Sequence, residues 1–389
     1  RLFERDPFIY FYEDFLKAYD KETRKARGVY YTPPPIVNFI VRAVDDILKD
    51  SFGIKDGLVD HKRVTVLDFA CGTGTFLLEV FQQVFDSIGG SDSARADLMV
   101  RQHFLEHVFG FEYLIAPYTI AHLKLSQYLH DQKHSLRDDE RLQVYLTNTL
   151  EPVEPQPNFL LPAVSAEVKA AQIIKEREIL VILGNPPYSA ISRNRGRWIS
   201  EAIEAYKVVD GKPFGEKKHW LHDDYVKFIR FAQMKMDIID EGVVGVITNS
   251  SFIDNPTFRG MRQSLMTTFD EIFSLDLNGN LRRKEQAPDG VRDENVFDIE
   301  QGVAITLFVK RPLEEKRIRH AEVWGTRLSK YKFLSERSLE KIDWRDSLPV
   351  SPFYFFRPQA TQGQDEYSKF HGVREIMPTS ITGIVTARD

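Results

Sequence analysis

The chain has 389 residues, of which 42% are hydrophobic and 28% charged, and this length is typical of a globular protein of about two or three domains. The formal net charge of −5 argues against a protein that coats nucleic acid nonspecifically, but it does not exclude a local basic groove. No apolar run approaches the roughly 18 residues that a membrane span needs. The single cysteine, Cys71, excludes a disulfide framework and a cysteine-based zinc site.

The same composition indicates where the chain works. A lone thiol fits the reducing cytoplasm, and we expect neither a membrane anchor nor a metal site. The sequence begins at Arg1 with neither an initiator methionine nor a signal peptide. We therefore expect a piece of a longer polypeptide.

Apolar side chains at helical spacing predict a first helix over residues 7–20, and a charged stretch follows over 20–27. Next comes a block of two tyrosines, Thr32 and three prolines. In this block we expect Thr32 to cap a helix whose early positions are prolines and whose apolar face runs through residues 36–48.

A glycine-containing loop follows the first predicted strand, which covers residues 64–68 and ends in Asp68. Glycines at 72 and 74 allow the backbone to approach a ligand closely. A dinucleotide-binding loop would have a third glycine at the position of Leu77. The loop therefore suits a ligand without phosphates, such as S-adenosylmethionine, better than a dinucleotide.

Strands and helices alternate over residues 60–310. Further strands are expected at 108–113, 142–147, 180–183, 242–248, 272–277 and 303–309. Helices are expected at 94–107, 116–129, 164–178, 223–240 and 256–268. The alternation predicts an α/β fold with a largely parallel sheet covered by helices on both faces. Ligands of such sheets bind beyond the carboxyl ends of the strands.

The apolar run at 180–183 leads through Gly184 into the tetrapeptide Asn185-Pro186-Pro187-Tyr188. Two prolines stiffen this loop, and neither can donate a backbone hydrogen bond. The loop therefore presents the Asn185 side-chain carbonyl and a proline carbonyl as acceptors beside the ring of Tyr188. This arrangement suits a planar amino group, although a strand-end turn packed against a tyrosine would have the same sequence.

Polar side chains follow several of the predicted strands. Asp68, Glu112, Asn148 and Asn185 all lie at strand ends, so we expect them to gather along one edge of the sheet. Glu112 is placed to accept both hydroxyls of a ribose, or it is a solvated residue at the end of a strand.

Together these residues resemble the S-adenosylmethionine-dependent DNA methyltransferases that methylate amino groups, in the motif order of the gamma class. The block around Tyr31 and Thr32 comes first, the loop over 68–76 second, and the Asn185 tetrapeptide third. The resemblance is closer still to the methyltransferase region of type ISP enzymes, which are single-polypeptide restriction-modification enzymes. That closer likeness is carried by residues 6–7, 10–13, 27–33, 220–230 and 295–299.

This resemblance implies a Rossmann-like methyltransferase with a seven-stranded mixed sheet whose last strand is antiparallel. A helical segment would precede it, and a short α+β tail would follow. The implied cofactor is S-adenosyl-L-methionine, and at position 148 the family often has Asp in place of Asn. The residues implied to bind the cofactor are Tyr31, Thr32, Asp68, Ala70, Cys71, Gly72, Thr73, Gly74, Glu112, Asn148 and Thr149.

The implied reaction is direct methyl transfer to N6 of an adenine that is flipped out of double-stranded DNA. Asn185 and the Pro186 carbonyl would accept the amino hydrogens, while Tyr188 and Phe297 would stack on the base. No proton transfer is asked of the Tyr188 hydroxyl, so we expect its ring alone to matter. The implied catalytic residues are Asn185, Pro186, Pro187, Tyr188 and Phe297.

The resemblance also divides the chain into a helical lead-in or coupler (1–27), a methyltransferase catalytic domain (28–312) and a connector towards a target recognition domain (313–389). Nuclease, helicase and target recognition domains are expected in the same longer polypeptide. Two alternatives remain open. One is a protein-glutamine methyltransferase, because a glutamine amide also fits the tetrapeptide, and the other is a non-catalytic DNA-binding or coupling module that only binds the cofactor.

Overall fold

The computed structural model describes residues 31–152, 162–188, 192, 194–216, 219–281, 287–288, 290, 292–313, 315–359, 363–367, 369–377 and 379. The helix expected at 7–20 lies outside these residues. Among the helices in the described ranges, none combines the length and the apolar character that a membrane crossing requires.

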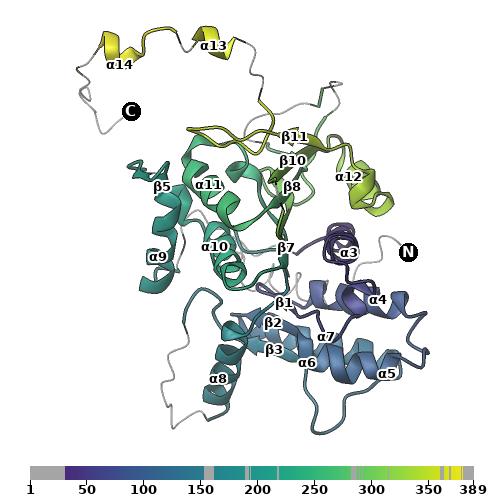
Figure 1. The fold of residues 1–389 in the computed structure, drawn as a ribbon. Coiled ribbons are helices and arrows are strands. Elements are labelled where there is room, and N and C mark those ends of the chain that lie inside the picture. The colour runs from purple at the N-terminus through teal and green to yellow at the C-terminus, as the bar shows by residue number, and fades with distance from the viewer. Residues whose placement is uncertain are drawn as a thin grey trace.

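A single large sheet forms the centre of the fold (Figure 1). Its strands run in the order β11-β10-β8-β9-β7-β4-β1-β2-β3. Their bounds are β1 (Val66–Asp68), β2 (Val108–Glu112), β3 (Gln143–Leu146), β4 (Val181–Gly184), β7 (Gly242–Asn249), β8 (Glu271–Asp276), β9 (Val303–Lys310), β10 (Arg317–Glu322) and β11 (Arg345–Ser347). The strands β1 to β4 and β7 pair in parallel, and β9 lies antiparallel between β7 and β8.

The expected α/β architecture is confirmed, and all seven expected strands are present. The expectation that the last of the seven is antiparallel is also confirmed, by β9. The strand count is wrong, because β10 pairs with β8 and β11 pairs with β10 to make nine strands in the described part of the chain. These two strands, of which β11 forms the edge of the sheet, are rich in charged residues, so they lack the apolar run by which the other strands could be recognised.

The helices lie on both faces of the sheet. Figure 1 shows α3, α4 and α7 on one side and α8, α10 and α11 on the other. Their bounds are α3 (Pro34–Asp50), α4 (Thr75–Ser87), α7 (Ile115–Asp131), α8 (Pro162–Glu176), α10 (Asp224–Asp237) and α11 (Arg259–Thr268). The helix expected at 94–107 consists of α5 (Ala96–Met99), a π-helical turn (Val100–Phe104) and α6 (Leu105–His107).

Shorter elements complete the described chain. A two-stranded hairpin, β5 (Val208–Val209) and β6 (Lys212–Pro213), follows α9 (Arg197–Ile203). Beyond residue 312, α12 (Arg327–Glu336) packs against α3, and the short helices α13 (Gln364–Tyr367) and α14 (Val373–Ile376) follow. The domain boundaries at 27 and 312 stay predictions.

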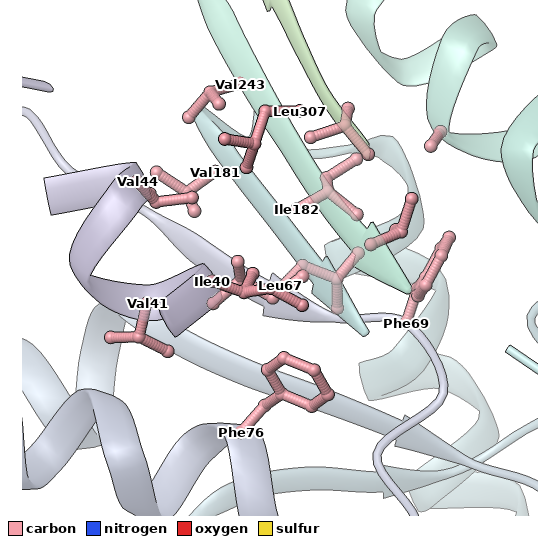
Figure 2. Close-up of a cluster of buried hydrophobic side chains, with 14 of the residues drawn as sticks. Ile40, Val41, Val44, Leu67, Phe69, Phe76, Val181, Ile182, Val243 and Leu307 are labelled. Carbon is pink, nitrogen blue, oxygen red and sulfur yellow. The ribbon is translucent and has the colours of Figure 1, made fainter. Parts of the chain in front are cut away.

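The helix α3 is fixed on the centre of the sheet by apolar packing. Figure 2 shows Ile40 of α3 beside Leu67 of β1 and Val44 of α3 beside Val181 of β4, and all four side chains are buried. A Cβ added at Gly245 of β7 would lie 2.9 Å from Ile40 and 3.1 Å from Val44, so the glycine lets the helix lie directly on the strand. This packing places the start of α3 beside the carboxyl end of β4, where Thr32 reaches Asn185.

Candidate active site

The carboxyl ends of the parallel strands share one edge of the sheet. Asp68 ends β1 and Glu112 ends β2, while Asn185 follows β4 directly and Asn148 lies two residues beyond β3. Because these four strands are adjacent and parallel, the four side chains belong to one edge. The prediction that they gather there is confirmed.

The glycine loop after β1 is folded tightly against β2. The Cys71 amide donates to the Phe111 carbonyl at 2.9 Å, and the Gly74 amide donates to the Cys71 carbonyl at the same distance. Gly72 has φ 54° and Gly74 has φ 77°, a region that favours glycine. A Cβ at Gly72 would meet no atom within 4 Å, whereas Gly74 lies against Ala121. The loop therefore opens at Gly72, and Ala70 and Thr73 beside it are partly exposed.

Asp68 is a buried carboxyl group with one unused oxygen. Its side chain is 0% exposed. Its Oδ1 accepts a hydrogen bond from the Ala70 amide at 3.1 Å, and Oδ2 has no partner among the described residues. Burial raises the pKa of Asp68 to about 8, with a smaller contribution from Glu112. A cationic ligand beside Oδ2 would place a positive charge next to the Asp68 carboxyl group and would stabilise its ionised form.

Glu112 holds the glycine loop to the end of β2. Its Oε2 accepts from the Gly72 amide at 2.9 Å and its Oε1 accepts from the Leu114 amide at 2.7 Å. These bonds fix the carboxylate at the loop opening, and each of its oxygens can accept more than one hydrogen bond. The geometry is compatible with a carboxylate that also accepts from two vicinal hydroxyls.

The end of β3 contributes two residues with different surroundings. Thr149 is buried, and its hydroxyl donates to the Phe69 carbonyl at 2.6 Å. Asn148 accepts from the Leu150 amide at 3.0 Å through Oδ1 and donates to Asn194 Oδ1 at 3.0 Å through Nδ2. Thr149 thus secures the backbone at the end of β1, while Asn148 joins a wider network.

Close backbone approach brings the loop after β4 to Asp68. A Cβ at Gly184, where φ is 153°, would lie 2.5 Å from the Phe69 ring and 3.2 Å from Asp68 Oδ1. The next residue, Asn185, donates from Nδ2 to Thr32 Oγ1 at 2.9 Å. Pro186 is buried and Pro187 partly exposed. The loop is therefore held against both the glycine loop and the chain before α3.

Tyr188 fixes the other end of the Asn185 amide. Its side chain is 7% exposed, and its hydroxyl lies 2.7 Å from Asn185 Oδ1 and 3.1 Å from the Ile247 carbonyl. A phenol has one hydrogen to donate, and the shorter contact is the one to Asn185. The hydroxyl thus orients the amide, a role that the sequence did not suggest.

Thr32 does not cap α3. The N-cap of α3 is Pro33, which makes no side-chain capping bond, and the helix begins at Pro34. The Thr32 hydroxyl instead accepts from Asn185, and its side chain is 6% exposed. The capping prediction was wrong because the Thr32 hydroxyl bonds to Asn185, in the loop after β4, rather than to a backbone amide of the first turn of α3. Tyr31, just before it, is partly exposed.

Phe297 lies in a loop that is fastened by a buried ion pair. Its side chain is 4% exposed, and its amide donates to Asn295 Oδ1 at 2.8 Å. In the same loop, Asp293 pairs with Lys330 of α12 at 2.7 Å, with almost no exposure of either side chain. Asn249, at the carboxyl end of β7, donates to Gln301 Oε1 at 3.1 Å. The Phe297 loop therefore reaches the same edge of the sheet as Asn185.

Sequence reasoning missed four residues beside this edge. Ser192 and Asn194 follow the tetrapeptide, and Asp224 and Lys227 lie in the first turn of α10. Asp224 accepts from Ser192 at 2.5 Å and from Asn194 at 3.0 Å. Charged residues in an amphipathic helix normally face water, so only the burial of Asp224 and Lys227 sets them apart. Among the described residues, no group of three or more His, Cys, Asp or Glu is arranged to hold a metal ion.

The chain matches the family model described as N-6 DNA Methylase over residues 3–248. It is similar to the solved structure of the ATP-dependent type ISP restriction-modification enzyme LlaBIII bound to DNA, with 27% identity and a TM-score of 0.75, covering 92% of this chain and 24% of that chain. It is also similar to a DrdV–DNA complex, with 27% identity and a TM-score of 0.73, covering 88% of this chain and 32% of that chain.

A nuclease-deletion mutant of the type ISP enzyme LlaGI shares the fold at 24% identity, with a TM-score of 0.72, covering 91% of this chain and 33% of that chain. This chain thus spans between 24% and 33% of the length of these three structures. A comparison with curated proteins gave no match. The family model covers well over half of the 389 residues, and the expected kinship is confirmed: the chain belongs to the N-6 DNA methylase family.

Proposed function

We propose that this chain transfers a methyl group from S-adenosyl-L-methionine to N6 of adenine in DNA, as the modification part of a restriction-modification enzyme. One observation carries the proposal. The Asn185 amide is oriented from both sides, by Thr32 at 2.9 Å and by Tyr188 at 2.7 Å, at the end of the strand that adjoins the glycine loop. An amide held in this way presents a fixed acceptor to an amino group.

The residues around the glycine loop fit the proposed cofactor. The unpartnered Oδ2 of Asp68 suits a cationic ligand, and the open space at Gly72 admits a ligand close to the backbone. When bound, S-adenosyl-L-methionine supplies an electrophilic methyl group. The residues that would hold it are Tyr31, Thr32, Asp68, Ala70, Cys71, Gly72, Thr73, Gly74, Glu112, Asn148 and Thr149.

The loop over Asn185 to Tyr188 would hold the target base. An adenine amino group is buried inside a duplex, so the base must first be flipped out. An amide oxygen has two lone pairs, so Asn185 Oδ1 can accept an amino hydrogen while Tyr188 donates to it. The Pro186 carbonyl would accept the other hydrogen. Positioning of the amino nitrogen, rather than proton transfer by a side chain, would then carry the rate.

Two rings are candidates to stack on the flipped base. Stacking on an aromatic side chain is worth about 1–3 kcal/mol per base. Tyr188 belongs to the loop that would hold the amino group, and Phe297 belongs to a loop that reaches the same edge of the sheet. Both side chains are buried in the protein alone, so a base would enter between them only after a local opening.

The wider setting is also part of the proposal. We infer that the chain works in the cytoplasm within a longer polypeptide that carries nuclease, helicase and target recognition domains. The similarity to LlaBIII, an ATP-dependent restriction-modification enzyme bound to DNA, supports this arrangement. In it, residues 1–27 would couple to the preceding domains, 28–312 would catalyse, and 313–389 would connect to target recognition.

The experiment is a transfer assay with the full-length protein, labelled S-adenosyl-L-methionine, and both duplex DNA and cell protein as acceptors. We expect label in DNA, and in N6-methyladenine after digestion to nucleosides. Label in protein glutamine would favour the glutamine methyltransferase instead. Cofactor binding without transfer to any acceptor would favour the non-catalytic module.

A further inference from the structure

A chain of hydrogen bonds runs from the end of β3 to the start of α10. Asn148 Nδ2 donates to Asn194 Oδ1 at 3.0 Å, and Asn194 Nδ2 donates to Asp224 Oδ1 at 3.0 Å. At the other end, Asn148 Oδ1 accepts from the Leu150 amide at 3.0 Å. Three segments that are distant in sequence are thereby joined beside the glycine loop.

Both ends of this chain have a fixed polarity. The Leu150 amide can only donate, so it requires an oxygen from Asn148. An ionised carboxylate can only accept, so Asp224 requires a nitrogen from Asn194. Both requirements are met by one arrangement. Asn148 turns its oxygen to the Leu150 amide and its nitrogen to Asn194, and Asn194 turns its oxygen to Asn148 and its nitrogen to Asp224. Rotation of either side-chain amide by 180° would exchange its oxygen and nitrogen and would place two acceptors or two donors next to each other.

The Asp224 carboxylate is itself held in place. Ser192 donates to its Oδ1 at 2.5 Å, and Lys227 donates to the Ser192 hydroxyl at 2.6 Å and to the Asn194 carbonyl. All three side chains are buried. Burial lowers the pKa of Lys227, and the nearby Asp224 carboxylate opposes that shift. The network therefore fastens residues 192 and 194, which follow the tetrapeptide, to the first turn of α10.

We propose that Asp224 is a positioning residue for the cofactor pocket, which sets the orientation of the Asn148 amide through Asn194. This inference rests on the proposed function, in which Asn148 adjoins the cofactor. A carboxylate at position 148 would face the side-chain oxygen Oδ1 of Asn194. Rotating the Asn194 amide by half a turn would relieve that contact, but it would place Oδ1 against the Asp224 carboxylate.

We therefore expect an acid at position 148 to be harmful in this protein. Asn148→Asp puts two oxygen acceptors together at the 3.0 Å contact with Asn194. In an Asn194→Ala background the opposing carbonyl is gone, so most of the penalty of Asn148→Asp should disappear. Such dependence of one substitution on another is the signature of residues in one network.

The test measures binding of S-adenosylhomocysteine to the full-length protein by calorimetry, and the melting temperature without ligand. We expect Asp224→Ala to weaken binding about tenfold, the scale of a lost buried hydrogen bond. The matched control is Asp237→Ala at the opposite end of α10, where the carboxylate accepts from Thr268. This control should change affinity by no more than about twofold, a surface-like effect.

The decisive measurement is the double-mutant cycle. We expect Asn148→Asp to weaken binding about tenfold alone and about threefold or less in the Asn194→Ala background. Equal losses in both backgrounds, or an Asp224→Ala variant that binds as tightly as Asp237→Ala, would overturn the inference. If Asp224→Ala does not fold, the cycle alone decides.

The same variants separate this inference from the proposed function. A wild-type protein that binds no S-adenosylhomocysteine would contradict the cofactor assignment, whatever the variants do. The melting temperatures without ligand would still report on the hydrogen-bond chain. Additive changes in melting temperature for Asn148→Asp and Asn194→Ala would then show that the two amides do not depend on each other.

Discussion

Asn185 Nδ2 lies 2.9 Å from Thr32 Oγ1, although 153 positions separate the two residues. The bond joins the loop after β4 to the segment before α3. In the proposed function, these segments hold the target base and the cofactor, respectively. One hydrogen bond would thus connect the two halves of the site.

Thr32→Ala removes the acceptor of this bond. Losing one hydrogen bond costs about 0.5–1.5 kcal/mol, so we expect single-turnover methylation to slow by up to about tenfold. Thr32→Ser keeps the hydroxyl and should retain most of the rate. If both variants methylate DNA as fast as the wild type, Thr32 does not orient Asn185.

The Tyr188 hydroxyl gives a second prediction. Tyr188→Phe keeps the ring but loses the bond to Asn185, which is worth about 0.5–1.5 kcal/mol, so we expect a moderate loss of rate of up to about tenfold. Tyr188→Ala also removes the stacking surface and should lose about ten- to a hundredfold more. Single-turnover rates, with fluorescence of 2-aminopurine at the target position, would separate orientation from base flipping. Equal rates for Tyr188→Phe and Tyr188→Ala would rule out stacking as the role of the ring.

Asp68 makes stability depend on pH. Burial raises its pKa from 3.8 to about 8, so the folded protein keeps a proton that the unfolded chain releases between these values. The free energy of unfolding therefore falls as the pH rises through this window. Asp68→Asn removes the titration, and its melting temperature relative to the wild type should rise steadily from about pH 5 to about pH 8.

The comparison of Asp68→Asn with the wild type excludes a second buried carboxyl group with a strongly raised pKa. Asp276 has its pKa raised by burial to about 7, but it titrates in both proteins and cancels in the difference. Asp68→Asn should also weaken binding of S-adenosylhomocysteine, because the amide cannot balance the positive charge of the ligand's ammonium group. A difference in melting temperature that stays constant with pH would mean that Asp68 is ionised in the folded protein.

Much of the fold was predictable from sequence because seven strands are short apolar runs that end in polar or glycine residues. Parallel pairing then brings their carboxyl ends to one edge, so Asp68, Glu112, Asn148 and Asn185 could be grouped without coordinates. The last two strands in the chain, β10 and β11, could not be recognised because their residues are largely charged or polar. Their pairing depends on the neighbouring strand rather than on their own pattern.

The contacts within the site could not be predicted in the same way. The Thr32–Asn185 bond and the link from Asn148 through Asn194 to Asp224 join residues that are remote in sequence. Local rules instead favoured a helix cap for Thr32, and they did not single out Asp224 within its helix. Packing determines which of two possible partners a polar side chain bonds to. Here the packing of α3 and α10 places Thr32 beside Asn185 and Asp224 beside Asn194.

Gly184 offers a prediction about stability. A Cβ there would lie 2.5 Å from the Phe69 ring, and its φ of 153° disfavours other residues. We expect Gly184→Ala to lower the free energy of unfolding by about 1–3 kcal/mol, as overpacking does, and to impair cofactor binding. The matched control is Gly211→Ala, which has φ 72° but no atom within 4 Å of the added Cβ. Equal melting temperatures for the two variants would show that the loop can move away from Phe69.

The central claim is methylation of adenine N6 in DNA by a site built on Asn185. The most direct measurement is the N6-methyladenine content, by mass spectrometry of nucleosides, of DNA from cells that express the full-length protein or its Asn185→Ala variant. We predict N6-methyladenine in the first DNA and at least a hundredfold less in the second, about the cost of losing one positioned electrostatic group. Equal amounts in both, or none in either while the protein is folded and binds cofactor, would contradict the account.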